Sequence, residues 1–129
     1  ETLAANPDFG KALVGAWYEV MDKIAAGDEA ALSAMAEAAG TDLAGYKKQL
    51  EATHLYTDPA EAAELMNSQE LLDTMQRVAE FSYKHGLLGA GAPGPDFVGI
   101  ENPAGVYGMP SNVQLRFDPS YTEGYDQAQ

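Results

Sequence analysis

The chain has 129 residues, of which 46% are hydrophobic, and seven basic against twenty acidic side chains give it a net charge of −13. This size and apolar content predict one globular core and argue against a disordered chain. Because so negative a surface repels phosphate backbones and anionic lipid, nucleic-acid binding and membrane-surface binding are both disfavoured. A well-solvated surface explains the charge, and attraction of a cationic ligand is the alternative.

The sequence contains no cysteine, which excludes disulfide scaffolds, thiol catalysis and cysteine-ligated metals. No stretch approaches the ~20 apolar residues of a membrane span, so membrane insertion is not expected. The chain starts at Glu1 without an initiator Met or a signal-like segment. We therefore expect that it was processed, trimmed or cut from something longer.

Asn6 and Pro7 predict the start of a long helix, with Asn6 as a polar cap and Pro7 at the first helical position. Apolar residues spaced by three and four then predict an amphipathic helix that Gly27 ends. This apolar stripe consists of Phe9, Leu13, Trp17, Val20 and Ile24. We expect the stripe to be buried, and for Trp17 core packing is favoured over stacking on a ligand.

Two shorter helices follow, the first capped by Asp28 and the second by Thr41 or Asp42 and running to about Thr53. Their expected buried residues are Leu32, Met35 and Ala39 in the first and Leu43, Tyr46 and Leu50 in the second. The turns between these helices are short, so neighbouring helices are predicted to pack against each other.

A break at His54–Thr57 precedes a fourth helix, because Asp58-Pro59-Ala60-Glu61 matches a capping box with proline at the first helical position. Ser68 begins the last long helix, which Gly86 ends. Its expected inward residues are Leu71, Leu72, Met75, Val78, Ala79 and Tyr83. The chain is thus predicted to be mainly α, with about five helices between Pro7 and His85.

Glycine and proline are dense after Gly86, and their density excludes a long helix there. Val113–Phe117 alternates apolar and polar residues and predicts one short strand, followed by a polar tail that lies over the helices or frays. We therefore divide the chain into a helical region, residues 1–86, and a Gly/Pro-rich segment, residues 87–129, that packs on it.

No catalytic, metal or cofactor site emerges from the motifs. Gly89–Gly94 matches the letters GxGxxG, but it follows a helix and precedes a proline-rich loop, so a flexible turn is favoured over a dinucleotide site. His54 and His85 share no metal-ligand spacing, and surface histidines are favoured over a metal site. No serine lies in a GxSxG context. The chain is predicted not to be an enzyme.

Tyr56 and His54 are the candidate ligand-binding residues. Tyr56 lies in a break just ahead of a helix N-terminus, where free N–H groups and an aromatic face can meet a small polar ligand. A surface tyrosine packed over the turn is the simpler interpretation, and the ligand-binding role is the alternative.

Five ordered blocks, which together extend over nearly the whole chain, resemble the substrate-binding proteins of ABC importers of the nitrate, sulfonate and taurine class. They are Asn6–Met21, Met35–Leu43, His54–Ala62, Phe81–Gly89 and Asn112–Asp118. The nearest subgroup is similar to the binding protein encoded beside urea carboxylase. None of the blocks is a reaction motif.

The resemblance implies a two-lobed α/β periplasmic-binding-protein fold, of which this chain is the C-terminal part, and hinge closure around the ligand. The implied ligand is a small nitrogen-containing solute such as urea or guanidine. The implied partners are an ABC permease and the remaining N-terminal part of the binding protein. The implied location is the periplasm, or an extracytoplasmic site with a lipid anchor in the full-length form.

A different class of function needs no family resemblance. The stripe that contains Phe9, Leu13 and Trp17 is equally consistent with a stand-alone helical protein-interaction or oligomerisation domain.

Overall fold

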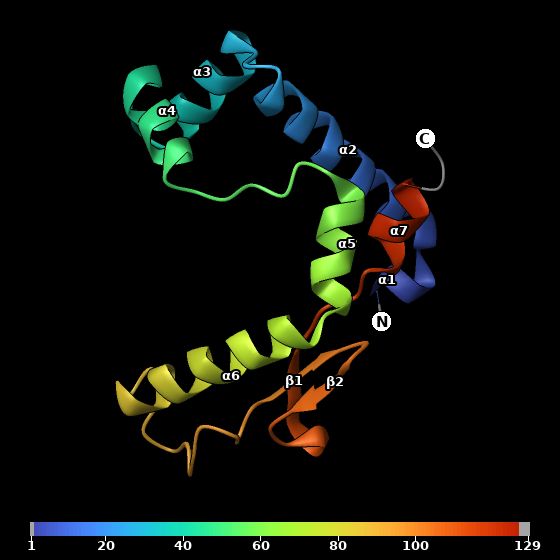
Figure 1. The fold of residues 1–129 in the computed structure, drawn as a ribbon, viewed down its shortest axis with the longest axis vertical. Coiled ribbons are helices and arrows are strands. Elements are labelled where there is room, and N and C mark those ends of the chain that lie inside the picture. Colours follow the sequence, from blue (N-terminus) through green and yellow to red (C-terminus); the bar gives the residue numbers. More distant parts are fainter. Residues whose placement is uncertain (1, 127–129) are drawn as a thin grey trace. The chain divides into compact units, whose positions relative to one another are not determined.

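A computed structural model of the protein describes residues 2–126 and confirms a mainly helical chain with a small sheet (Figure 1). Its helices are α1 (Thr2–Ala5), α2 (Pro7–Ala25), α3 (Glu29–Ala38), α4 (Leu43–Glu51), α5 (Pro59–Asn67), α6 (Gln69–Lys84) and α7 (Ser120–Asp126). Its strands are β1 (Gly99–Asn102), β2 (Gly105–Tyr107) and β3 (Val113–Arg116), and a 3-10 turn covers Pro110–Asn112.

The described chain forms two compact units. The first unit comprises the residues up to Ala62 together with those from Tyr121, and the second comprises Ala63–Ser120. Within residues 2–126, no helix combines the length and the apolar character needed to cross a bilayer.

The long N-terminal helix α2 forms as predicted, with Pro7 in its first turn, and the chain leaves it through Gly27 at a φ of 69°. The predicted cap by Asn6 is wrong, because the Asn6 side chain makes no capping hydrogen bond. Its Nδ2 instead donates to the Thr2 carbonyl at 3.0 Å. The short helix α1, which the sequence did not predict, provides that carbonyl.

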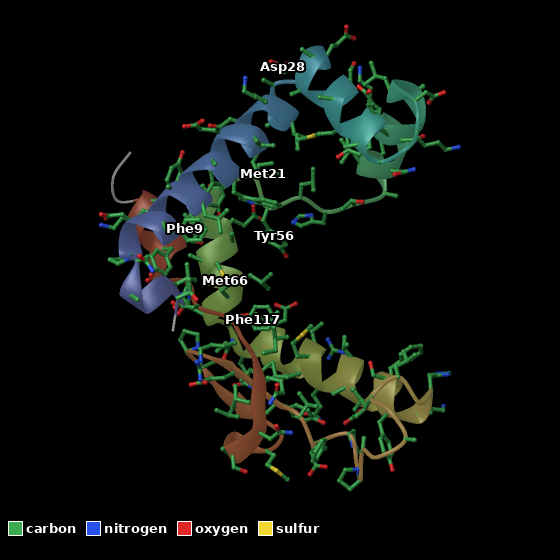
Figure 2. All side chains as sticks on the ribbon, turned by 180° about the vertical axis from the view of Figure 1, so that it is seen from behind. Phe9, Met21, Asp28, Tyr56, Met66 and Phe117 are labelled. Atoms are coloured by element: carbon green, nitrogen blue, oxygen red, sulfur yellow. The ribbon has the colours of Figure 1, made fainter. Side chains whose placement is uncertain are left out.

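The buried face of α2 differs from the predicted stripe. Gly10, Tyr18 and Met21 are its buried residues, whereas Phe9, Leu13 and Trp17 are 57%, 58% and 58% exposed. Phe9 and Met21 are both labelled in Figure 2, and Phe9 is exposed whereas Met21 is buried. The expected core packing of Trp17 is therefore wrong. Helical periodicity identifies an apolar face, but it does not show which face the rest of the unit covers.

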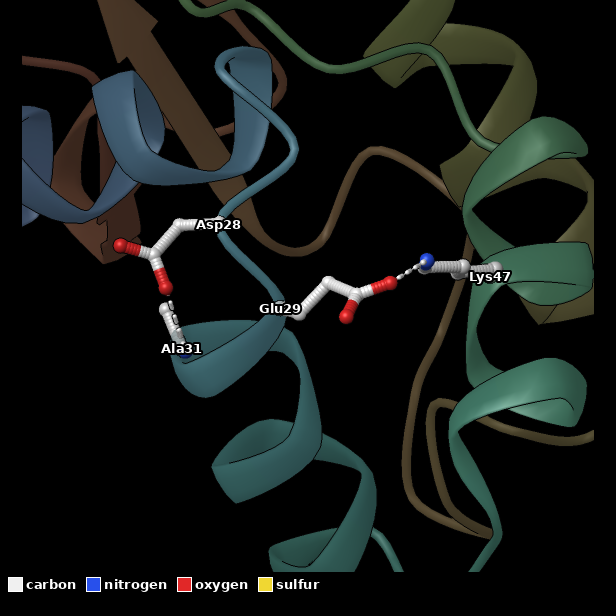
Figure 3. Close-up of polar contacts among 4 residues, drawn as sticks. All are labelled: Asp28, Glu29, Ala31 and Lys47. Carbon is white, nitrogen blue, oxygen red and sulfur yellow. Dashed lines mark hydrogen bonds and ion pairs between the residues drawn. The ribbon is translucent and has the colours of Figure 1, made fainter.

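The helical pair α3 and α4 follows the predicted capping chemistry. The Asp28 carboxylate accepts from the Ala31 N–H at 2.9 Å, and Asp42 caps α4 by accepting from the Gly45 N–H at 2.7 Å. The two helices pack together, and Lys47 Nζ lies 3.5 Å from Glu29 Oε1 (Figure 3).

The buried residues of this pair differ in part from those predicted. Leu32 and Ala36 are buried and Ala39 is exposed, so the inward face of α3 passes through Ala36 and not through the predicted Ala39. Met35 and the three residues expected to be buried in α4 are only half-buried.

In the second unit, α6 begins at its predicted cap, because Ser68 Oγ accepts from the Leu71 N–H at 3.1 Å. Leu71, Leu72 and Ala79 are buried as expected. Val78 and Tyr83 were also expected to point inward, but they are 48% and 41% exposed. Strands β1 and β2 contact α6 (Figure 1).

The Gly/Pro-rich segment contains three strands in the order β2-β1-β3, where the sequence predicted β3 alone. Strands β1 and β2 form an antiparallel hairpin, and β3 pairs with β1 in parallel. The hairpin loop has a recognisable turn signature, with Asn102 first, Pro103 second and Gly105 fourth. Glu101 and Arg116 are register partners on β1 and β3, and their side chains form an ion pair at 2.7 Å.

Asn102 joins this hairpin to the start of α6. It is only 4% exposed, and its Nδ2 donates to the carbonyls of Met66 at 3.0 Å and Ser68 at 2.8 Å. Its Oδ1 accepts from the N–H groups of Ala104 and Gly105 at 2.9 and 3.2 Å. All four hydrogen-bonding positions of the amide are thus occupied, as burial requires.

The polar tail contains the helix α7, which the sequence did not predict; at seven residues it does not contradict the exclusion of a long helix after Gly86. Asp118 Oδ1 accepts from the Ser120 N–H at 3.0 Å and starts the helix. Tyr121 donates its hydroxyl proton to the Leu3 carbonyl at 3.2 Å, so α7 packs on the N-terminal helices of the first unit. Residues 127–129, also part of the predicted tail, lie outside the described residues.

Candidate functional site

The segment that contains the predicted ligand-binding residues connects α4 to α5 in the first unit. It has no regular secondary structure, and a proline at position 59 disfavours helical backbone in the residue before it. Asp58 then begins α5, because its Oδ1 accepts from the Ala60 N–H at 2.8 Å. Within this segment His54 is exposed and Tyr56 is half-buried (Figure 2).

His54 and Tyr56 are in direct contact. Their ring centroids lie 4.6 Å apart and the ring planes meet at 75°, an edge-to-face arrangement. On helix α5, Glu61 Oε1 lies 3.9 Å from His54 Nε2. The imidazole therefore contacts an aromatic ring and also lies near a carboxylate. We call His54, Tyr56 and Glu61 the His54 cluster.

Sequence reasoning identified two of these three residues and missed Glu61 as a site residue. A signal was present, because the glutamate of a capping box reaches back towards the residues before its helix. Glu61 does reach back, but towards the His54 imidazole. The side chains of His54 and Glu61 are 69% and 54% exposed, so water screens their attraction and the pair adds little stability.

A stacked aromatic pair, in which Tyr18 is buried and Tyr125 is half-buried, lies on α2 and α7 of the same unit. Tyr18 is 4% exposed and stacks on Tyr125, with ring centroids 5.2 Å apart and an angle of 17° between the planes. Thr122, also on α7, is 7% exposed. Burial raises the pKa of Tyr18; the Thr122 side chain opposes this rise, and the charge of Asp58 adds to it.

The exposed face of α2 is the second notable surface of this unit. An open, apolar hollow of about 510 Å³ is lined by Leu13, Val14, Ala16, Trp17 and Val20. Full burial of one large apolar side chain contributes ~1.5–3 kcal/mol to the free energy of folding. Because several such side chains are exposed on this face, several kcal/mol of that free energy are not gained. Trp17 therefore lies at the surface and not in the predicted core.

The other motifs remain without a site. Gly89–Gly94 lies in an irregular segment that leads to β1 and is not followed by a helix, so it lacks the geometry of a dinucleotide loop. His85 ends α6 in the second unit and contacts Phe81, with ring centroids 4.2 Å apart. Among residues 2–126, no three His, Asp or Glu side chains are grouped in a way that could hold a metal ion.

A small hollow of about 190 Å³ lies in the second unit, beside the Glu101–Arg116 ion pair. Both Nε and Nη2 of Arg116 lie 2.7 Å from Glu101 Oε2. Since the guanidinium already has a carboxylate partner, this hollow is a poor site for a further anion.

Comparisons of the chain with models of protein families, with curated proteins and with solved structures found no match.

Proposed function

We propose that this chain is part of the substrate-binding component of an ABC importer, and that the solute is a small nitrogen-containing compound such as urea or guanidine. The five sequence blocks described above support this proposal by their resemblance to such binding proteins. In this proposal the chain has no catalytic role, and an ABC permease and a further part of the binding protein are its partners.

The His54 cluster is the observation that carries the ligand class. The Glu61 carboxylate can accept hydrogen bonds from the N–H groups of a planar solute, and the Tyr56 ring offers it an aromatic face. Asp58 and Glu61 place negative charge at the N-terminus of α5, which offsets its positive dipole. With a net charge of −13, the chain favours a neutral or cationic solute over nitrate or a sulfonate.

Calorimetry on the whole binding protein, of which this chain is proposed to be a part, tests the proposal. Urea and guanidinium chloride should each give saturable heat at low millimolar concentration or below, whereas sodium nitrate and taurine should not. Absence of saturable heat from urea, guanidinium and related solutes would remove the proposed ligand class.

Variants locate the site. Glu61→Gln should weaken guanidinium binding about tenfold or more, because a hydrogen bond to a charged group is lost. His54→Ala should also weaken binding, whereas His85→Ala, the matched change at the second histidine of the chain, should leave it unchanged. Equal effects of the two histidine changes would contradict the assignment of the site.

A second candidate function, a helical domain that associates with a second copy of itself, is favoured by the exposed face of α2 alone. Light scattering over a range of concentrations separates the two functions. A dimer that Trp17→Glu converts to a monomer supports self-association, and a monomer at all concentrations removes it.

A further inference from the structure

The exposed face of α2 has the spacing of a surface that pairs with another helix. Its apolar row has intervals of four, three and four residues, which is the repeat that two packed helices share. The row consists of Phe9, Leu13, Ala16 and Val20. Trp17 lies beside the row and helps to line the open hollow of about 510 Å³, whose lining residues are all apolar. An occupant of this face therefore needs apolar side chains at a matching helical spacing.

The two margins of this face differ in character. On one side, Gly10 lies about two helical turns before Trp17, and the Tyr121 ring of α7 packs closely over it. On the other side, Asp8 and Glu19 lie about three turns apart on one line of the helix, and both are exposed. A helix that docks on α2 thus has α7 along one margin and carboxylates along the other.

The charge of the first unit determines which sign the occupant carries. This unit contains 13 acidic and four basic side chains, a net charge of −9. Lys11 of α2 lies 3.9 Å from Asp8, and Lys23, its other lysine, lies 3.9 Å from Asp28. Among the ion pairs of residues 2–126, none includes Glu19. The unit therefore attracts a basic partner and repels a second copy, which itself has a charge of −13.

We propose that the exposed face of α2 binds an amphipathic helix of a partner, with apolar side chains at heptad spacing and lysine or arginine along its margin. The apolar row supplies the contact area, and the negative charge selects the sign of the partner. In the proposed function, the further part of the binding protein supplies this helix. The proposal itself rests on the face and its charge and not on the solute, so it can stand where the calorimetry with urea and guanidinium fails.

Two synthetic peptides of about 20 residues, long enough to form a helix, test the proposal on the full chain. Both have leucine at heptad spacing and lack tryptophan; one has lysine and the other glutamate along its margins. The emission of Trp17, the single tryptophan of the chain, reports binding. The lysine peptide should shift this emission to shorter wavelength and saturate at micromolar concentration, and the glutamate peptide should bind about tenfold more weakly or worse. No saturation by the lysine peptide, or equal binding of the two peptides, would overturn the proposal.

Variants of the chain locate the binding surface. Leu13→Gln keeps the net charge and should weaken binding of the lysine peptide about tenfold or more, because leucine burial is lost. Leu87→Gln is the matched control, since Leu87 is 69% exposed in the second unit, and it should leave binding unchanged. Circular dichroism checks that both variants stay helical. Equal losses in the two variants would indicate non-specific binding and would overturn the proposal.

Glu19→Lys tests the role of charge with the apolar row intact. It should weaken binding of the lysine peptide and strengthen that of the glutamate peptide, each severalfold, and an unchanged preference would overturn the proposal. An increase of sodium chloride from about 0.05 M to about 0.5 M should weaken the lysine peptide severalfold through screening. Light scattering tests the other occupant: a peptide-free dimer that Leu13→Gln converts to a monomer would overturn this proposal and favour self-association.

Discussion

Asn102 makes more hydrogen bonds through its side chain than a surface turn requires. Its amide joins the carbonyls that end α5 and begin α6 to the N–H groups of the β1–β2 turn. Because the residue is 4% exposed, removal of the amide would leave several backbone groups buried without partners. A single side chain therefore fixes the register of the hairpin against the helix.

We expect Asn102→Ala to lower the free energy of unfolding by about 3 kcal/mol, because each buried group that loses its partner costs ~1–3 kcal/mol. Asn112→Ala is the matched control. The Asn112 side chain donates to the Phe97 carbonyl at 2.8 Å and accepts from Gln114 Nε2 at 2.8 Å, both in an exposed setting, so its removal should cost less than the loss of Asn102, about 1 kcal/mol. Urea unfolding of both variants measures the difference, and equal losses would contradict the joining role of Asn102.

Asp28 gives the first unit a dependence on acid. The hydrogen bond from the Ala31 N–H is the main reason that the pKa of Asp28 is lowered, and Lys23 adds to it. A carboxyl whose folded pKa is depressed stabilises the fold above its unfolded pKa, and this contribution is lost as the pH falls through the folded pKa.

We therefore expect the urea midpoint to fall between about pH 5 and pH 2, and to fall less in Asp28→Asn. Asparagine keeps a capping oxygen but does not titrate in this range. If Asp28→Asn loses as much stability in acid as the parent chain, the capping carboxylate does not contribute to the acid dependence.

At the scale of elements, the packing of α7 on α2 depends on the absence of a side chain at Gly10. A Cβ at this position would lie 2.5 Å from Cε1 of Tyr121, which is closer than van der Waals contact allows. At Gly15 on the same helix, a Cβ would lie 3.9 Å from Tyr125 Cε2, an ordinary contact. The two glycines differ in environment but not in secondary structure.

Gly15→Ala should therefore stabilise the chain by about 0.5–1 kcal/mol, because alanine favours a helix over glycine. Gly10→Ala should instead destabilise it by about 1–3 kcal/mol through overpacking. Tyr121→Ala in the Gly10→Ala background should recover part of the loss. Thermal unfolding of the four chains tests this, and equal stabilisation by both alanines would contradict the close packing of Tyr121.

Elements whose stabilising contacts are local could be predicted from sequence. Asp28, Asp42 and Ser68 each bond to an N–H three residues ahead, so the caps and the helices that they start are visible in the chain. Strands β1 and β2 were missed because they are short and rely on pairing, although the Asn102–Gly105 turn indicated the hairpin. Helix α7 was missed because its contacts with Leu3 and Tyr18 are distant in sequence.

The contacts of the candidate site are likewise either local in sequence, and predictable, or distant in sequence, and not predictable. His54 and Tyr56 are sequence neighbours, and their contact follows from their place in one short segment. Glu61 was recognised as a capping residue but not as a partner of His54. The burial of Tyr18 could not be predicted, because the residue lies beside the apolar stripe and its stacking partner Tyr125 belongs to a distant helix.

For the whole molecule, the main unexplained feature is the apolar face of α2. Phe9, Leu13 and Trp17 are each more than half exposed, which is unusual for three large apolar residues in a row on one helix. The proposed function assigns this face to a further part of the binding protein, and the second candidate assigns it to another copy. Trp17 is the single tryptophan of the chain, so its fluorescence reports on this face alone.

In the isolated chain, Trp17 should emit like a solvated indole and should be quenched efficiently by acrylamide, a neutral quencher that the negative charge of the chain does not repel. Covering of the face should shift the emission to shorter wavelength and reduce quenching severalfold. Trp17→Phe provides the blank, because it removes the signal. A blue, poorly quenched emission from the dilute monomer would contradict the exposed position of Trp17.

Composition and three-dimensional contacts divide the chain into two parts at different residues. Composition places a boundary at residue 86, and this division stays a prediction. Contacts among the described residues instead separate two units between Ala62 and Ala63, and they return α7 to the first unit.

The docking of α7 has a consequence for the order in which the protein acquires its structure during synthesis. The hydrogen bond from Tyr121 to Leu3 spans 118 positions, so it can form only when almost all of the described chain has left the ribosome. Helices α2, α3 and α4 emerge much earlier and can pair through short turns. Until α7 arrives, Tyr18 lacks its stacking partner Tyr125, and both faces of α2 are open to chaperones or to aggregation.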